Sequence, residues 1–236
     1  LIGDLGADGA TYRALEFTGS TVKNMTVASR MTMANMAIEA GAKCALFTPD
    51  EKTAEYCGIE LNDFQKSLSG DTDATYIKTI TYRAEDFVPV MACPSQVDKI
   101  RDVSDLEGTE IDQVFIGSCT NGRLEDLKAA AEVLKGKKVA KYVKLIVTPA
   151  SRKIYRQAID MGIMDVLAEA GAIITHPGCG LCCGRTGGIL TDGERVVATN
   201  NRNFLGRMGT SKVEIYLASP KTAAACAVAG KIVKPE

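Results

Sequence analysis

At 236 residues, the chain is long enough to form one large domain or two domains of ordinary size. Its formal net charge of −1 gives no electrostatic basis for binding nucleic acid or an anionic membrane surface. No apolar run reaches the roughly 18–20 residues that a membrane-spanning helix needs. We therefore expect neither nucleic acid nor a membrane among its partners.

The first 110 residues predict short and varied elements. The opening residues have the pattern of a strand interior, and the chain lacks an initiator methionine, so we expect the natural N-terminus to lie upstream. The remaining elements are a helix-like segment at 10–17, a helix at 25–40 that ends at Gly41, a strand at 45–47, a helix that opens near Pro49, a strand at 75–82 and a connector at 88–110. We place a domain boundary near residue 105 because the connector contains two prolines and many charges.

From residue 111 onward, apolar strands alternate with helices. Strands are predicted at 113–116, 144–147, 172–175, 195–198 and 214–217, and helices at 124–134, at 152–170 and after the Ser219 cap with Pro220 at the first position. This alternation favours a parallel sheet covered on both faces. The predicted fold class is therefore α/β, with two domains (1–105 and 106–236) of mostly parallel sheets flanked by helices.

The residues best suited to chemistry follow the predicted strands directly. Cys119 lies in IGSCTNGR, Cys179 and Cys182 lie in HPGCGLCCG, and Asn201–Arg207 forms the loop after the strand at 195–198. In parallel α/β sheets, ligands bind outside the carboxyl ends of the strands. The three loops are therefore predicted to form one site.

The clustered thiols indicate a metal centre. The eight cysteines show no disulfide framework, which favours a reduced, cytoplasmic setting. Three thiolates from two loops can hold an iron–sulfur cluster and leave one iron without a protein ligand. A zinc-stabilised structural or binding module remains open, because His176 or Cys183 could complete a set of four ligands. The other cysteines (44, 57, 93 and 226) are expected to pack as small apolar side chains.

Two further pairs are candidates for binding a substrate. Arg202 and Arg207 suit a carboxylate clamp, because guanidinium groups bind carboxylates in a bidentate manner; a solvated surface loop is the alternative. Asn35 and Glu39 are four residues apart in a predicted helix, so they share a face, which could equally be a solvated polar patch. Nucleotide binding is disfavoured because neither glycine-rich phosphate-binding motif is present.

Four segments together resemble one known family. MTMANMAIEAGAK, IGSCTNGR, PGCGLCCG and NNRNFLGR, in this order along essentially the whole chain, resemble the aconitase family. The endings EIYLASPKTAAA and AVAGKI are most similar to large subunits of two-subunit members, which isomerise isopropylmalate or a homoaconitate-type acid. The resemblance implies a hydro-lyase that dehydrates and rehydrates a small di- or tricarboxylate hydroxy acid.

The resemblance also assigns a cofactor and the residues that hold it. It implies a 4Fe-4S cluster on Cys119, Cys179 and Cys182. The family's pattern has proline at the position of Leu181 and an aliphatic residue at the position of Cys183, and neither departure removes a ligand.

The other matching residues receive active-site roles. Asn35 and Glu39 would lie near the substrate hydroxyl, Asn201 would donate a hydrogen bond at the cluster, and Arg202 and Arg207 would hold substrate carboxylates.

Two parts of the family's machinery are expected outside this sequence. These are the first domain and the swivelling domain, which in two-subunit members is a small partner subunit that carries the catalytic base. We therefore expect residues 1–236 alone to show no turnover. A non-catalytic subunit that only stores a cluster is the remaining alternative.

Overall fold

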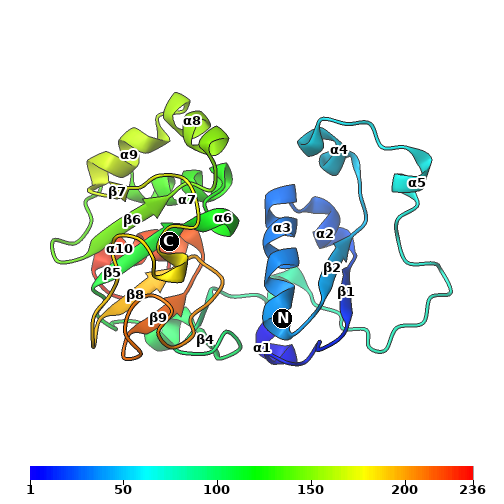
Figure 1. The fold of residues 1–236 in the computed structure, drawn as a ribbon, viewed down its shortest axis with the longest axis horizontal. Helices are drawn as coiled ribbons and strands as arrows, with labels where there is room; N and C mark the ends of the chain where they lie inside the picture. The colour runs from blue at the N-terminus through cyan, green and yellow to red at the C-terminus, as the bar shows by residue number, and fades with distance from the viewer. Residues whose placement is uncertain (236) are drawn as a thin grey trace. The chain divides into compact units, whose positions relative to one another are not determined.

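The computed structural model describes residues 1–235, which divide into two compact units (Figure 1). The larger unit consists of Leu1–Ala7 and the chain from Pro89 onward, and the smaller unit is Asp8–Val88. Glu236, the last residue of the predicted second domain, lies outside the described residues.

A seven-stranded sheet forms the centre of the larger unit, in the order β4-β3-β9-β8-β5-β6-β7. The strands from β9 to β7 are parallel, whereas β3 pairs antiparallel with both β4 and β9. The strands are β3 (Val90–Ala92), β4 (Ile100–Asp102), β5 (Gln113–Gly117), β6 (Lys144–Thr148), β7 (Ile173–Ile174), β8 (Arg195–Ala198) and β9 (Glu214–Leu217). The helices are α1 (Ile2–Leu5), η3 (Val103–Leu106), α6 (Ser118–Asn121), α7 (Leu124–Leu134), α8 (Arg152–Asp160), α9 (Ile163–Ala170), η4 (Gly180–Cys183) and α10 (Pro220–Ala229).

Strand β5 shows why this sheet is buried on both faces. Its side chains alternate, so Val114 and Ile116 pack into the core on one face and Phe115 into the core on the other. Helices α7, α9 and α10 cover the first face with residues such as Leu127 and Leu167. The second face is covered mainly by η4 and by the loops around β8, with Ile2 of α1 at its margin.

Local sequence explains where the helices of the larger unit begin and end. Ser219 accepts a hydrogen bond from the Thr222 amide and Pro220 fills the first turn of α10, as predicted. The single helix predicted at 152–170 is wrong. It is two helices, because Gly162 adopts a left-handed conformation (φ 70°) that ends α8 and starts α9.

The smaller unit is built on two parallel strands, β1 and β2, paired from Ala14 with Cys44 to Phe17 with Phe47. Phe17 and Phe47 stack with ring centroids 5.1 Å apart. Its elements are β1 (Ala14–Phe17), α2 (Ser20–Asn24), α3 (Val27–Met36), η1 (Ala37–Ala40), β2 (Cys44–Phe47), α4 (Glu51–Cys57), α5 (Asp63–Lys66) and η2 (Ala84–Asp86). The helix predicted at 25–40 is confirmed as α3 and η1, with Gly41 as a left-handed cap.

Several predictions in the first 110 residues are wrong. Residues 14–17 form a strand rather than a helix, because pairing with β2 outweighs their local preference. Residues 75–82 alternate in polarity but form no strand, since the whole segment is exposed and has no partner strand. The opening residues form α1 instead of a strand, and the predicted connector at 88–110 contains the short strands β3 and β4.

The chain thus has an α/β fold with a mostly parallel, mixed sheet flanked by helices. Strands β3 and β4 belong to the large sheet although they precede residue 105, and the domain boundary placed there remains a prediction. Among residues 1–235, no helix is both long enough and apolar enough to span a membrane.

Candidate functional site

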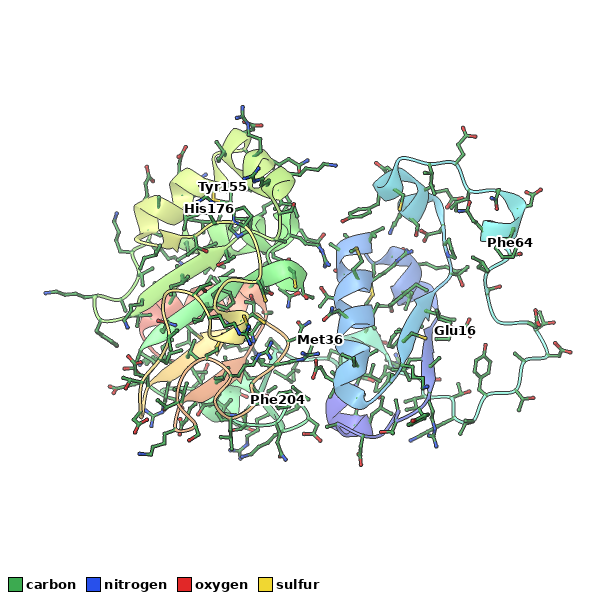
Figure 2. The ribbon with its side chains drawn as sticks, viewed as in Figure 1. Glu16, Met36, Phe64, Tyr155, His176 and Phe204 are labelled. Carbon is green, nitrogen blue, oxygen red and sulfur yellow. The ribbon has the colours of Figure 1, made fainter. Side chains whose placement is uncertain are left out.

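The predicted site loops all leave the large sheet at the carboxyl ends of parallel strands. The loop with Cys119 follows β5, the loop with Cys179 follows β7, and the asparagine-rich loop follows β8. Because β5 pairs in parallel with both β6 and β8, these carboxyl ends lie at one edge of the sheet. His176 and Phe204, labelled in Figure 2, mark the loops after β7 and β8.

The turn that carries Cys119 is unusually tight. Gly117 has φ 134°, and a side chain there would overlap the carbonyl oxygen of Thr148 on the neighbouring strand. Ser118 follows with φ 82°, a left-handed conformation that a non-glycine residue rarely adopts. The chain can therefore turn sharply from β5 into α6, and Cys119 is left exposed.

A short segment after β6 joins the two cysteine loops. On one side, the Ala150 amide donates to the carbonyl oxygen of Gly122 at 2.9 Å, just after Cys119's helix. On the other side, the Gly178 amide donates to the carbonyl oxygen of Pro149 at 3.0 Å, immediately before Cys179. The turn at residues 148–150 therefore holds both loops by backbone hydrogen bonds.

The thiols of the second loop lie close together around η4. Desolvation of the Cys179 thiol raises its pKa to about 12, and the neighbouring thiols of Cys182, Cys183 and Cys119 add to this effect. Cys179 is exposed as a residue, whereas Cys182 is buried in the second core and Cys183 is half-buried. Helix α6, which carries Cys119, is in contact with η4, so the two cysteine loops converge.

Arg207 is aimed at this group of sulfurs. Its Nε donates to the carbonyl oxygen of Cys182 at 2.7 Å, and its terminal NH2 nitrogen lies 3.6 Å from the Cys182 sulfur. The backbone supports this placement, because a Cβ on Gly184 would lie 2.6 Å from the carbonyl oxygen of Arg207. Arg207 therefore brings a positive charge directly to a candidate ligand.

Asn201 connects the third loop to the first. Its side-chain amide donates to the Thr120 hydroxyl at 3.2 Å, and the Thr120 hydroxyl lies 3.8 Å from the sulfur of Cys119. The Gly117 amide donates to the Thr199 hydroxyl at 2.8 Å, which ties the two loops again at their origins. Arg202, in contrast to the buried Asn201, is half-buried.

The candidate metal-binding side chains of this site are thiols. Among the described residues, no three His, Cys, Asp or Glu side chains are placed to hold one metal ion. A structural zinc needs four ligands at about 2.0–2.3 Å from one point. In a cluster each thiolate binds a different iron, so Cys119, Cys179 and Cys182 need not converge on one point. Thiolates are the donors that hold iron–sulfur clusters, so the chemistry of these three side chains is compatible with such a cluster.

Asn35 and Glu39 lie in the smaller unit and differ in their solvent exposure. Asn35 is exposed near the end of α3, whereas Glu39 is 6% exposed in η1. The chain tightens from α-helix to 3₁₀ helix at Ala37, which rotates Glu39 away from the position that regular i, i+4 spacing would give it. Their catalytic roles remain predictions.

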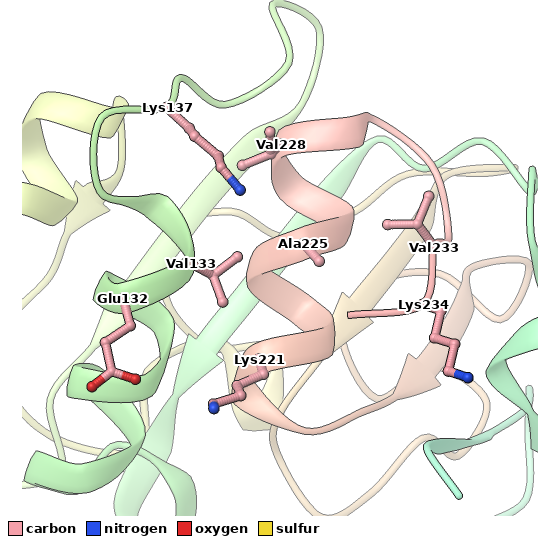
Figure 3. A pocket seen from close by; sticks show the side chains of 8 residues that line it. All are labelled: Glu132, Val133, Lys137, Lys221, Ala225, Val228, Val233 and Lys234. Atoms are coloured by element: carbon pink, nitrogen blue, oxygen red, sulfur yellow. The ribbon is translucent and has the colours of Figure 1, made fainter. Parts of the chain in front are cut away.

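One groove of the larger unit contains no candidate site residue. It has a volume of about 450 Å³ and lies against α7, α10 and the C-terminal segment (Figure 3). It is lined by Glu132, Val133, Lys137, Lys221, Ala225, Val228, Val233 and Lys234. Because it offers neither a thiol nor a close set of donors, we locate the functional site at the cysteine loops.

Of the remaining four cysteines, two are buried and two are exposed. Cys93 and Cys226 are buried as small apolar residues, and burial raises the pKa of the Cys226 thiol to about 11. Cys44 and Cys57 are exposed, so the prediction that they pack in a core is wrong. The sequence reading also missed the threonines that hold the loops, Thr120, Thr148 and Thr199, although each ends a strand or adjoins a motif residue.

Comparison with known proteins identifies a family for this chain. The family model described as "Aconitase family (aconitate hydratase)" matches residues 1–230. The chain belongs to the aconitase family. Membership of this family implies an iron–sulfur cluster, and the close grouping of Cys179, Cys182 and Cys183 is consistent with it.

Curated members of the aconitase family resemble the chain along its whole length. It is 53% identical to the 3-isopropylmalate dehydratase large subunit 2 of Archaeoglobus fulgidus over 238 residues, which cover 100% of this chain. It is 52% identical to the 3-isopropylmalate dehydratase large subunit 1 of Methanopyrus kandleri, with 99% of this chain covered. It is also 51% identical to the probable methanogen homoaconitase large subunit of Methanosarcina mazei, with 100% of this chain covered. The chain spans 57%, 56% and 59% of the lengths of these three relatives, respectively.

Proposed function

We propose that the chain is part of the large subunit of a 4Fe-4S hydro-lyase that converts 2-isopropylmalate to 3-isopropylmalate in leucine biosynthesis, in the cytoplasm. The observation that carries the proposal is the turn at residues 148–150, which holds the loops of Cys119 and Cys179 side by side. The names of two relatives at 53% and 52% identity support the choice of substrate. In the same proposal, the chain contributes two α/β domains of the aconitase type.

Cys119, Cys179 and Cys182 would hold the cluster, which when bound supplies a Lewis acid to the site. Arg207 lies against Cys182, so a substrate carboxylate that pairs with Arg207 would be held next to the cluster. Arg202 would bind a second carboxylate of the substrate. Asn201, fixed by its hydrogen bond to Thr120, would orient the substrate by donating a hydrogen bond.

Proton transfer would be shared between this chain and a partner. Dehydration needs a base for the carbon-bound proton and an acid for the departing hydroxide. We assign the acid role to the Glu39 carboxyl group, assisted by Asn35. We assign the base to a small subunit with a swivelling domain, so this chain alone should show no turnover.

Cysteine substitutions test the proposed ligands. Cys119→Ser, Cys179→Ser and Cys182→Ser should each prevent a stable cluster after anaerobic reconstitution with iron and sulfide. Matched controls are Cys183→Ala beside the site, and Cys93→Ala and Cys226→Ala in the core, all of which should retain it. Full iron content and an unchanged visible spectrum in any of the three serine variants would contradict the assignment.

Metal analysis and an activity assay separate the other functions. A zinc module would contain zinc and lack the broad visible absorption of a cluster, and a cluster-storing subunit would give no turnover even when the expected first domain and the small subunit are both supplied. The reconstituted complex should be assayed with 2-isopropylmalate and with homocitrate. The second substrate has specific support, because the Methanosarcina mazei relative named as a homoaconitase is 51% identical. Faster turnover of homocitrate would replace our choice of substrate.

A further inference from the structure

Thr148 occupies a central place among the site loops that none of the proposed roles explains. It is the last residue of β6, it is completely buried, and it pairs with Gly117 in the parallel register of β5 and β6. It contains neither a metal-binding thiol nor an ionisable group. Its position, however, brings it into contact with the loops of two proposed ligands.

The backbone of Thr148 packs against the loop of Cys119. The glycines on either side of the short helix α6, Gly117 and Gly122, both approach its carbonyl oxygen. A Cβ on Gly122 would lie 2.5 Å from that oxygen, and a Cβ on Gly117 would overlap it. The helix that carries Cys119 therefore rests directly on the end of β6.

The side chain of Thr148 packs against the loop of Cys179. Its hydroxyl oxygen lies 2.6 Å from the hydroxyl oxygen of Thr175, which begins that loop. A Cβ on Gly180, the residue after Cys179, would lie 2.5 Å from the same hydroxyl oxygen and 2.9 Å from the Thr148 methyl carbon. Gly180 also has φ 57°, so both its conformation and its close approach favour glycine.

We infer that Thr148 is a positioning residue that sets the spacing between Cys119 and Cys179 and thereby the retention of the cluster. The inference rests on the proposed function, because it presumes that these two cysteines bind the cluster. Its physical basis is that one buried residue contacts both loops, through its backbone on one side and its side chain on the other. Residues that orient metal ligands without binding the metal commonly change affinity or activity by about 10–100-fold when they are mutated.

Valine and serine separate the two parts of this side chain. Thr148→Val keeps the shape but replaces the hydroxyl group by a methyl group, which cannot remain 2.6 Å from the Thr175 oxygen. Either Thr175 or Gly180 must then move, and the Cys179 loop moves with it. Thr148→Ser keeps the hydroxyl pair and should therefore preserve the loop.

The experiment measures how fast the reconstituted cluster is lost. The full chain is loaded anaerobically with iron and sulfide, a chelator is added, and the decay of the visible absorption is followed. We expect Thr148→Val to lose its cluster about tenfold faster than the wild type, consistent with the effects of other residues that support metal ligands. Thr148→Ser should lose its cluster at a rate close to that of the wild type. This result would assign the effect of Thr148→Val to the loss of the hydroxyl group.

A matched control distinguishes positioning from general stability. Thr222 is also buried, and its hydroxyl lies 2.9 Å from that of Ser219, so Thr222→Val makes the same chemical change in another hydroxyl pair. Thermal unfolding of each apo variant and the electron paramagnetic resonance spectrum of each reduced cluster complete the comparison. Only Thr148→Val should combine faster loss with an altered spectrum.

Three outcomes would overturn the inference. The first is that Thr148→Val retains its cluster as long as the wild type does. The second is that Thr222→Val loses its cluster as fast as Thr148→Val does, so that the rate of loss simply follows the fall in melting temperature. The third is a Thr148→Val variant that folds poorly, together with a Thr148→Ser variant that loses its cluster as fast as Thr148→Val does. A wild-type chain that takes up no cluster would refute the proposed function itself, a result that is recognisable before any variant is made.

Discussion

The two units of the chain bury different kinds of side chain. The larger unit packs Phe115, Leu127 and Leu167 into cores on both faces of a seven-stranded sheet. In the described part of the smaller unit, every buried apolar residue is an alanine, and the large side chains of its two-stranded sheet are exposed or half-buried. Its most buried long side chain is Arg30, 4% exposed and paired with Asp50 at 2.6 Å.

This difference indicates that the two units are stabilised in different ways. Burial of large apolar side chains contributes about 1.5–3 kcal/mol each, and the larger unit has many of them. The described part of the smaller unit buries no large apolar side chain, and it contains the Arg30–Asp50 pair and the stack of Phe17 on Phe47. The cysteine loops therefore lie on a well-packed support, and the following changes test whether that contrast holds.

Removing a phenylalanine should have the largest effect and the clearest asymmetry. We expect Phe115→Ala to destabilise the larger unit by about 3–5 kcal/mol, because the residue is fully buried. Phe47→Ala, the matched change in the smaller unit, should cost about 1–2 kcal/mol, since that ring is half-buried and stacks on Phe17. Hydrogen exchange read by mass spectrometry on peptides of each unit measures both. Equal losses would show that the two units do not differ in packing.

Asp126 should make the larger unit less stable as the pH rises. Burial raises its pKa to about 6, from about 3.8 when exposed. Between these values the unfolded chain loses its proton before the folded chain does, so about 2 kcal/mol of stability is lost as the pH rises from 4 to 7. Asp126→Asn should remove this slope, because asparagine does not titrate. The local structure should be kept, since the amide oxygen can still accept the Arg123 amide proton. Denaturant unfolding at several pH values tests it, with the exposed Asp165→Asn as control; an unchanged slope in Asp126→Asn would contradict the assignment.

Asp50 should give the smaller unit the opposite pH dependence. Its hydrogen bond from Arg30 lowers the Asp50 pKa to about 2, against the opposing effect of burial, and the Thr53 amide lowers it further. This stabilisation, about 1–2 kcal/mol after allowance for solvent screening, is fully present above pH 4 and is lost as the pH falls toward 2. Hydrogen exchange of the smaller unit between pH 5 and 2 should show the loss.

Two variants check the origin of this acid sensitivity. Asp50→Asn should abolish it, because no carboxylate remains to be protonated. Asp192→Asn in the larger unit removes a carboxylate from an exposed pair with Lys212 and should change little. A persistent acid loss in Asp50→Asn would place its origin elsewhere.

Helix caps should show the smallest effects and no asymmetry. Thr26 accepts the Ser29 amide at the start of α3 in the smaller unit, and Ser151 accepts the Ile154 amide at the start of α8 in the larger unit. Thr26→Ala and Ser151→Ala should each cost about 1 kcal/mol, because a cap acts on its own first turn. Local hydrogen exchange at the two helix starts measures this. A much larger loss for one cap would mean that its helix start also depends on tertiary contacts.

The contrast between the units also explains how much of the fold could be predicted. In the larger unit, the strands at 113–116, 195–198 and 214–217 and the helix at 124–134 were predicted almost residue for residue, since their apolar patterns correspond to real cores. In the smaller unit, residues 75–82 alternate in polarity but are exposed, so the predicted strand has no core to pack against. Strands β3 and β4 were missed because each has three residues, which is too short for a periodic signal.

The site was predictable in its parts but not in its connections. The positions of Cys119, Cys179 and Asn201 after strands followed from the pattern of elements and from the rule for parallel sheets. The contact of Arg207 with Cys182 and the joining of two loops through residues 148–150 depend on backbone geometry across 25 or more residues. No local pattern encodes such contacts, so only the structure reveals them.

The parallel direction of strands β5 to β9 has a practical consequence for protein engineering. The loops of the candidate site leave from the carboxyl ends, so the turns that enter the strands at their amino ends take no part in it. The exposed turn at Asp192–Gly193, just before β8, is one such place. A fluorescent label or an affinity peptide inserted there would report on the chain, or immobilise it, while leaving the three proposed ligands, Cys119, Cys179 and Cys182, undisturbed.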